Sequence, residues 1–131
     1  MHDIIQKIKL AIAEANKTQS IPILIDLNVK LAGYLAYLVE IQTAAHKGYN
    51  DAYALRKQEY ANRVINGDGS MGDRQMRAEI DIKEFRETEN RFDERYTELK
   101  NYSFATSNFI DVLTQKIAYL RKEQEITRQN T

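Results

Sequence analysis

The sequence predicts an all-α protein built around a long antiparallel helical hairpin of the coiled-coil type. Only one proline and five glycines occur in 131 residues, and these two residue types are the commonest breakers of regular structure. Three of the glycines fall within residues 67–72. On both sides of that segment apolar residues recur every three or four positions, which is the spacing of one helix face. We therefore expect two long helices that meet at a turn over 67–72.

A short amphipathic helix is predicted first, over residues 3–17. Its apolar residues lie three or four positions apart, and the pattern ends where turn-prone residues gather at 16–19. We expect this helix to cover the exposed seam of the hairpin at one end, so that a three-helix bundle forms there. The residues of its stripe are Ile4, Ile5, Ile8, Ile12 and Ala15.

The second predicted helix covers residues 20–66. Ser20 is a suitable N-cap, and Pro22 falls in the first turn, where its missing N–H is harmless. Gly33 and Gly48 are interpreted as tolerated interruptions. Such a helix would be roughly 65–70 Å long at 1.5 Å per residue. Its stripe consists of Leu24, Leu27, Leu31, Tyr34, Leu38, Ile41, Ala45, Tyr49, Ala52, Leu55, Tyr60 and Val64.

The third predicted helix covers residues 73–126, after the turn over 67–72. Ser70 and Asp73 have the spacing of a capping box, with Asp in place of Glu. The tail over 127–131 is expected to fray, and a break over 103–108 is an alternative that the sequence leaves open. The stripe consists of Met76, Ile80, Phe85, Phe92, Tyr96, Leu99, Tyr102, Thr106, Phe109, Leu113, Ile117 and Leu120.

The short connection predicts that the two long helices pack antiparallel within a single domain, 1–131. Counting outward from the turn places Leu31 opposite Asn108. The apolar halves then meet at the three-helix end, and the charged halves form a thinner two-helix arm. The apolar halves are 23–41 and 102–120, and the charged halves are 46–65 and 74–94.

Composition narrows the classes of chemistry that we expect. The chain has no cysteine, so thiolate nucleophiles and sulfur-ligated metals are excluded. Neither His2 nor His46 has a second ligand at helical spacing, and residues 66–73 match neither a calcium loop nor a phosphate loop. We therefore expect no catalytic residue, no metal and no cofactor, and we expect that the protein is not an enzyme.

Charge and hydropathy predict a cytoplasmic protein. The formal net charge is zero, so nothing global attracts the chain to nucleic acid or to an acidic membrane. The N-terminal residues lack the pattern of a signal peptide. The most apolar run, 31–39, is far shorter than the roughly 20 residues of a membrane span. On these grounds we expect no membrane association.

Two tyrosines lie off the predicted seam. Tyr37 and Tyr53 have Lys30, Lys47 and Arg56 within a few helical turns. Aromatic rings among basic residues can stack the bases of single-stranded nucleic acid. Tyrosine and arginine are also enriched at protein interfaces. Both interpretations stay open on the sequence alone.

The predicted arm is too thin to bury all its apolar residues. Each large side chain contributes at most ~1.5–3 kcal/mol when fully buried, so a two-helix seam is marginal. We expect Ile82 and Tyr53 to remain exposed unless a second chain covers them. The sequence therefore predicts a homo-oligomer, a dimer or higher, with Ile82 and Tyr53 at or near the contact.

Three charged or apolar stretches near the C-terminus carry a resemblance. They are Glu89 to Lys100, Phe109 to Leu113, and Ile117 to Glu123. Together they resemble small all-helical bacteriophage proteins of early or DNA-metabolism gene clusters, in which a charged helix leads into a Leu–Lys/Arg–Glu pattern. The resemblance implies a phage accessory protein in the host cell cytoplasm. It carries no catalytic signature to any residue here.

The function that we expect from the sequence is that of a non-enzymatic assembly or interaction protein acting on a protein partner. The alternative is a single-stranded-DNA-binding accessory factor in phage replication or recombination. The sequence leaves open the identity of the partner, the stoichiometry, and whether a small ligand is bound between subunits.

Overall fold

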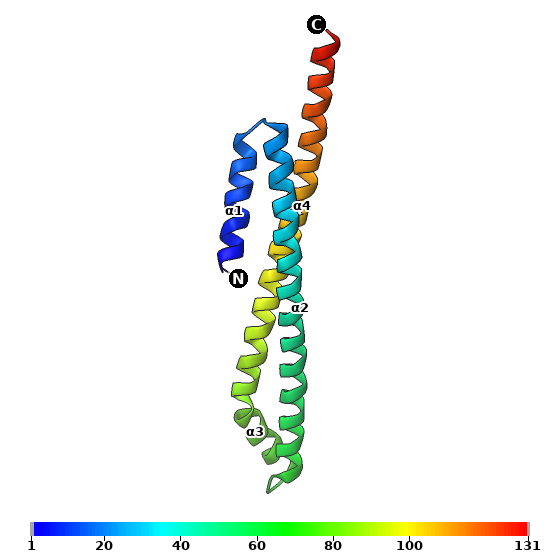
Figure 1. Cartoon of the computed structure of the whole chain (residues 1–131). Coiled ribbons are helices and arrows are strands. Elements are labelled where there is room, and N and C mark those ends of the chain that lie inside the picture. The colour runs from blue at the N-terminus through cyan, green and yellow to red at the C-terminus, as the bar shows by residue number, and fades with distance from the viewer. Residues whose placement is uncertain (1, 131) are drawn as a thin grey trace. The chain divides into compact units, whose positions relative to one another are not determined.

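The computed structural model describes residues 2–130 as four α-helices (Figure 1). They are α1 (His2–Lys17), α2 (Ile21–Asn66), α3 (Met71–Asp81) and α4 (Lys83–Gln129). No strand occurs among the described residues. The long helix α2 and the last helix α4 form the two sides of a hairpin, so the predicted all-α helical hairpin is confirmed.

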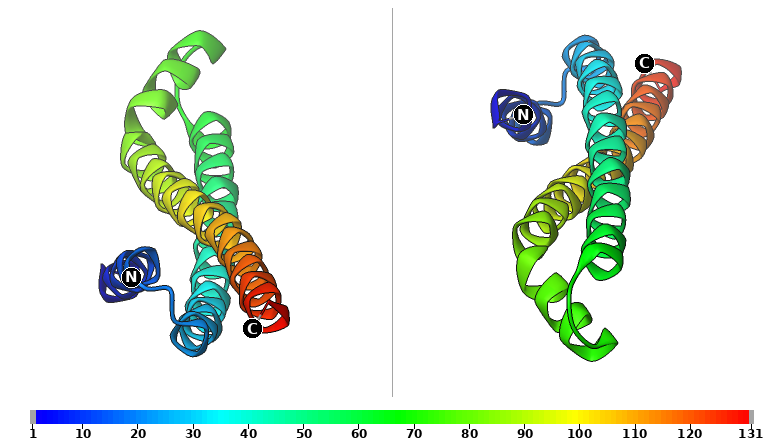
Figure 2. Two further views of the ribbon diagram at one scale, coloured as in Figure 1. Left: turned by 90° about the horizontal axis from the view of Figure 1, so that it is seen from above. Right: turned by 90° about the horizontal axis from the view of Figure 1, so that it is seen from below.

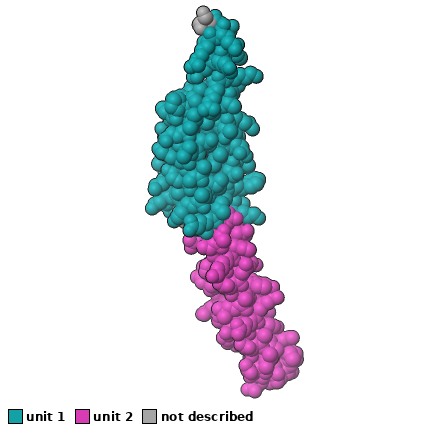
Figure 3. Space-filling view, turned by 45° about the vertical axis from the view of Figure 1, so that its right-hand side comes forward, with its two compact units in different colours: residues 1–41, 99–131 teal, residues 42–98 magenta. Residues whose placement is uncertain are grey.

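The chain divides into two compact units, coloured separately in Figure 3. Unit 1 consists of residues 1–41 and 99–131, and unit 2 consists of residues 42–98. Helices α2 and α4 each contribute one part to either unit, whereas α1 belongs to unit 1 and α3 to unit 2.

Unit 1 is a three-helix bundle of α1, the first part of α2 and the last part of α4 (Figures 1 and 2). The bundle predicted at this end of the hairpin is confirmed. Leucines fill its core, because the stripe that repeats every three or four residues faces inward on each helix. The buried side chains of α2 and α4 include Leu24, Leu27, Leu31, Leu38, Leu99 and Leu113, and those of α1 are Ile5, Ile8, Ala11 and Ala15.

Within unit 1, Lys116 of α4 forms hydrogen bonds with the C-terminal end of α1. Its Nζ atom donates hydrogen bonds to the carbonyl oxygens of Ala15 (2.9 Å) and Thr18 (3.1 Å). The last carbonyls of a helix have no partner inside the helix, and a cation there also complements the helix dipole. Ser20 then donates its backbone N–H to Thr18 Oγ1 at 3.1 Å, and α2 begins one residue later.

Unit 2 pairs the second part of α2 with α3 and the first part of α4, and small residues set the distance between the helices. Ala45 and Ala52 are buried on α2. Between them lies Gly48, where an added Cβ atom would be only 2.5 Å from Cε1 of Phe92. The ring of Phe92 therefore fills the space above this glycine. Gly48 is a required gap in the seam, and its interpretation as a tolerated interruption is wrong.

The helix predicted over 73–126 is divided in two at Ile82. The Ser70 cap is confirmed, because Ser70 Oγ accepts from the backbone N–H of Asp73 at 3.2 Å and α3 begins at Met71. At Ile82 the backbone has φ −91° and ψ 6°, and its N–H bonds to the carbonyls of Ala78 and Ile80. Helix α4 starts at the next residue and continues through 103–108, where the alternative break is not found.

The predicted stripe is out of phase near the turn. Met76 and Ile80 are 66% and 68% exposed, while Ala78 and Ile82 are buried. On α2, Leu55 is exposed and Arg56 takes the inward position. Ala78 is almost completely buried, at 1% exposure, so the inward face of α3 is marked by a small residue and not by Met76 or Ile80.

The antiparallel register differs from the predicted one by about one helical turn. In unit 1, Asn28 Nδ2 donates to Thr114 Oγ1 at 3.2 Å. The predicted pairing of Leu31 with Asn108 would instead have placed Asn28 opposite Asp111.

Helix α2 contains an 18-residue window with a mean hydropathy of 1.4, enough by length and composition to cross a membrane. A wider segment than the predicted apolar run 31–39 therefore passes this test, which allows at most two charged residues in the window. The absence of membrane association stays a prediction. Core helices of soluble proteins pass the same test, but they are mostly buried. Only 28% of this window is buried inside the protein.

Candidate interaction surfaces

An exposed apolar stripe runs along α2 within unit 1, and we call it the α2 stripe. It consists of Ile25, Val29, Ala32, Ala36 and Val39. All five are exposed, Val29 most among the large side chains at 67%. The steps between them are four, three, four and three residues. That alternation is the spacing of a coiled-coil seam, in which apolar side chains face a second helix.

The α2 stripe lies on the side of α2 turned away from α1. Leu27 and Tyr34, with Leu10 and Ala11 of α1, line a shallow cleft of about 170 Å³ between the two helices. At about 100° per residue, the stripe falls on the opposite side of α2 from Leu27 and Tyr34. Figure 2 shows α1 on one side of the hairpin only. The stripe is therefore an apolar face that α1 does not cover.

Two pairs of polar side chains on the surface of unit 1 are formed within single helices. Lys30 Nζ lies 3.2 Å from Asp26 Oδ2, one turn away on the same helix. The hydrogen bond to the Asp26 carboxylate is the main reason that the pKa of Lys30 is raised. On α4, the Tyr119 hydroxyl donates to Glu123 at 2.8 Å, and this raises the pKa of the phenol. Neither pair lies within the stripe, which carries no charge.

Tyr53 lies in unit 2 within a small aromatic and cationic cluster. Its ring centroid is 6.4 Å from that of Tyr49 in a stacked arrangement. Arg56 Cζ and Lys57 Nζ lie 5.2 Å and 4.7 Å from the centre of the Tyr53 ring, distances typical of cation–π contacts. The side chain is 37% exposed. We call these four residues the Tyr53 cluster.

The structure does not bring the two predicted stacking residues together in one unit. Tyr37 is 48% exposed and belongs to unit 1, whereas Tyr53 belongs to unit 2. No ring contact or cation of the Tyr53 kind is found at Tyr37.

The prediction that Ile82 stays exposed is wrong. Its side chain has no solvent exposure at all. The bend between α3 and α4 turns this residue inward together with Ala78. Ile82 is therefore not available on the surface for a contact with a second chain, whereas Tyr53 is exposed as predicted.

Charged side chains occupy inward positions in the seam of unit 2. The Arg56 guanidinium pairs with the Glu89 carboxylate, and the two side chains are only 16% and 12% exposed. Elsewhere in unit 2, the rings of His46 and Tyr96 lie with their centroids 4.7 Å apart and their planes tilted by 34°. Both pairs join α2 to α4, so they are explained by packing of the hairpin.

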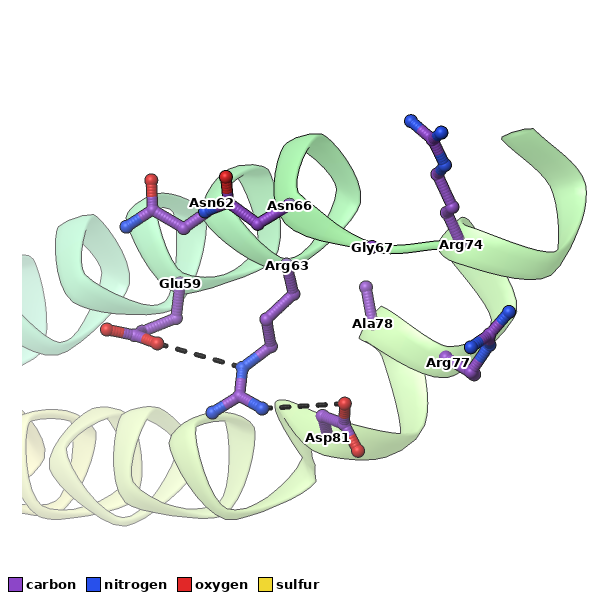
Figure 4. A pocket seen from close by; sticks show the side chains of 9 residues that line it. All are labelled: Glu59, Asn62, Arg63, Asn66, Gly67, Arg74, Arg77, Ala78 and Asp81. Atoms are coloured by element: carbon purple, nitrogen blue, oxygen red, sulfur yellow. Dashed lines mark ion pairs between the residues drawn. The ribbon is translucent and has the colours of Figure 1, made fainter. Parts of the chain in front are cut away.

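A cleft of about 330 Å³ opens beside the helix turn of unit 2 (Figure 4). Arg63 reaches across it and lies 3.7 Å from Glu59 and 3.4 Å from Asp81. Arg74 and Arg77 point away from Arg63 in Figure 4 and donate to the loop carbonyls of Gly69 and Asp68. The arginines here stabilise the turn. Across residues 2–130, no group of three metal-ligating side chains is found.

The α2 stripe was missed by the sequence analysis, although a signal for it is present. The buried stripe begins at Leu24, and a second apolar series with the same spacing begins one residue later at Ile25. The second series is the weaker signal, because two of its five members are alanines.

No protein-family model, no curated protein and no solved structure matches this chain.

Proposed function

We propose that this protein is a non-enzymatic helical interaction protein, and that its α2 stripe docks an α-helix of a protein partner. The observation that supports the proposal is the stripe itself, an uncharged apolar face with coiled-coil spacing that the rest of unit 1 leaves exposed. Apolar faces of this kind are a recurring feature of interaction sites.

The pattern of the stripe favours a helix over other partners. Side chains at steps of four and three residues fit between the side chains of a facing helix, as in helix-in-groove recognition. Ala32 and Ala36 at its centre allow the second helix to approach closely. Ile25, Val29 and Val39 flank them and supply the larger apolar surface.

The expected affinity is modest. Full burial of the three large side chains contributes roughly 1.5–3 kcal/mol each, against a cost of association of about 4–15 kcal/mol. The partner must therefore bring apolar side chains of its own. A dissociation constant on the order of micromolar is consistent with such an interface.

A bilayer is a less suitable partner than a helix for this face. The stripe occupies one side of α2, while the other sides of the same segment pack against α1 and α4. Beyond the stripe α2 continues without interruption into a charged stretch that includes Lys47, Asp51 and Arg56. The proposal therefore places the protein in the cytoplasm, and in the host cytoplasm if the resemblance to phage accessory proteins is correct.

Site-specific photo-crosslinking in the cell that makes the protein tests the proposal. A benzophenone amino acid replaces Val29 in the stripe, and in the control it replaces Val112, another exposed valine, on α4. We expect an adduct to one defined protein, identified by mass spectrometry, from position 29 and not from position 112. Adducts to lipid only, or the same adducts from both positions, would refute the proposal.

A second candidate function is binding of single-stranded DNA, which the Tyr53 cluster favours because it combines an accessible ring with two cations. The cations of the chain itself lie over that ring, so a base must displace Lys57. A labelled oligonucleotide should bind at low salt and dissociate as salt rises. Tyr53→Ala should weaken binding about tenfold or more, given the ~1–3 kcal/mol of base stacking. Absence of binding at low salt removes this candidate.

A further inference from the structure

We infer that the helix docked on the α2 stripe is the α2 helix of a second copy of this chain, in antiparallel orientation about a two-fold axis at the level of Tyr34. This inference rests on the proposed function and names its partner. It specifies which helix binds the stripe, in which orientation and in which register, and each of these three statements can be tested separately.

The last four residues of the stripe read the same from either end, and Ile25 comes to the level of Thr43. In an antiparallel pair centred at position 34, Ala32 of one copy faces Ala36 of the other, and Val29 faces Val39. The small residues meet at the centre, and the valines meet on both sides of them. A two-fold interface requires this kind of self-complementary surface, because the same patch must serve both copies.

Charges beside the stripe favour the antiparallel orientation. In a parallel pair each Glu40 would lie opposite Glu40 of the second copy. In the antiparallel register Glu40 comes to the level of residue 28 of the second copy, so the two Glu40 carboxylates are far apart. The formal net charge of the chain is zero, so no overall repulsion opposes association of two copies.

The degree of burial also points to a second copy. The most apolar segment of the chain is 28% buried within one molecule. Pairing two copies through this segment covers both exposed faces at once, and it needs no residue outside the chain. The exposed pair of Lys30 and Asp26 lies outside this contact.

Sedimentation equilibrium of the full chain tests the inference first. The wild type should approach twice 15.2 kDa at concentrations well above micromolar. Val29→Glu should return it to 15.2 kDa at the same concentrations, with at least a tenfold weaker association. Val112→Glu, an equally drastic change at an exposed valine of α4, should leave the dimer intact.

A second variant distinguishes loss of the dimer contact from loss of the fold. Ala36→Leu adds bulk where two alanines are expected to meet, introduces no charge and keeps a strong helix former at an exposed position. It should weaken the dimer about as much as Val29→Glu while the helical circular-dichroism signal remains unchanged.

Disulfide trapping then tests orientation, and the absence of native cysteines makes it unambiguous. An equimolar mixture of Val29→Cys and Val39→Cys chains should form a covalent dimer on mild oxidation, faster than either variant alone. Faster cross-linking of each single variant with itself would show a parallel pair and overturn the register.

The two proposals fail in different ways. A wild type that stays at 15.2 kDa up to the highest soluble concentration overturns the second-copy inference. The proposed function survives that result if position 29 still cross-links to a different protein. A dimer that Val29→Glu leaves intact overturns the inference as well, because the contact must then lie elsewhere on the chain.

Discussion

The two units use the same helical spacing and fill it with different residues. In unit 1 the inward positions hold leucines, and five of these are almost completely buried. In unit 2 the inward positions hold alanines, a glycine and an ion pair. Among the described residues of unit 2, Ile82 is the one large side chain that is buried to the same degree. Buried apolar area is the main source of folding free energy. Stability should therefore be concentrated in unit 1.

The difference separates two tasks. Unit 1 has a core strong enough to hold its three helices, and it leaves exposed the α2 stripe, which we propose as a docking surface. Unit 2 obtains its specificity from contacts that match in one register only, such as the Phe92 ring over Gly48 and the pair of Arg56 with Glu89. Buried polar pairs of this type can fix register at a cost in stability.

The largest expected effect comes from a charge placed in the core of unit 1. Leu38→Asp should lower the free energy of unfolding by more than about 4 kcal/mol and unfold the protein, because Leu38 has no exposure and the carboxylate would have no partner. Phe109→Asp should cost less, since that side chain is only half-buried. Val39→Asp, next to Leu38 but exposed, is the control and should keep the fold in urea titrations.

A smaller effect is expected from the ion pair in the seam of unit 2. Glu89→Gln should destabilise the protein by about 2–3 kcal/mol, because it leaves a mostly buried guanidinium without its counter-charge. Replacing both Arg56 and Glu89 by leucine should be near neutral or stabilising, as expected for an ion pair that fixes register. Asp26→Asn, in the solvent-exposed pair of unit 1, should change the denaturation midpoint little. Equal losses from Glu89→Gln and Asp26→Asn would contradict this account.

The smallest effects compare two glycines of α2. Gly33→Ala in unit 1 should stabilise the protein by about 0.5–1 kcal/mol, since an added Cβ meets nothing within 4 Å and alanine is the better helix former. Gly48→Ala in unit 2 should destabilise it by about 1 kcal/mol or more, because the Phe92 ring must move. Thermal denaturation of both variants measures the difference. Stabilisation in both would show that Phe92 does not need the gap.

Most of the fold could be predicted from the sequence, because helix periodicity and the scarcity of glycine and proline are local signals. The turn, the Ser70 cap and the three-helix bundle all followed from them. The bend at Ile82 did not, since no breaker residue lies there. It buries Ala78 and Ile82, and a small residue such as Ala78 gives almost no signal in an apolar pattern.

The candidate sites were less predictable because they depend on partners far apart in the chain. Arg56 takes an inward position only because Glu89, 33 residues away, supplies its counter-charge. The burial of Ile82 likewise depends on the bend. The α2 stripe was recognisable in principle, but only the packing of α1 and α4 decides which of the two apolar series of α2 remains uncovered.

Native-state hydrogen exchange measured residue by residue tests the contrast between the units most directly. Amides of buried leucines in unit 1, such as Leu31 and Leu113, should exchange only through global unfolding. Amides of unit 2 around Ala52 and Phe92 should exchange roughly 100-fold faster, through local separation of the seam. Equal protection in both units, or greater protection in unit 2, would contradict the claim that the core of unit 1 carries the stability of this protein.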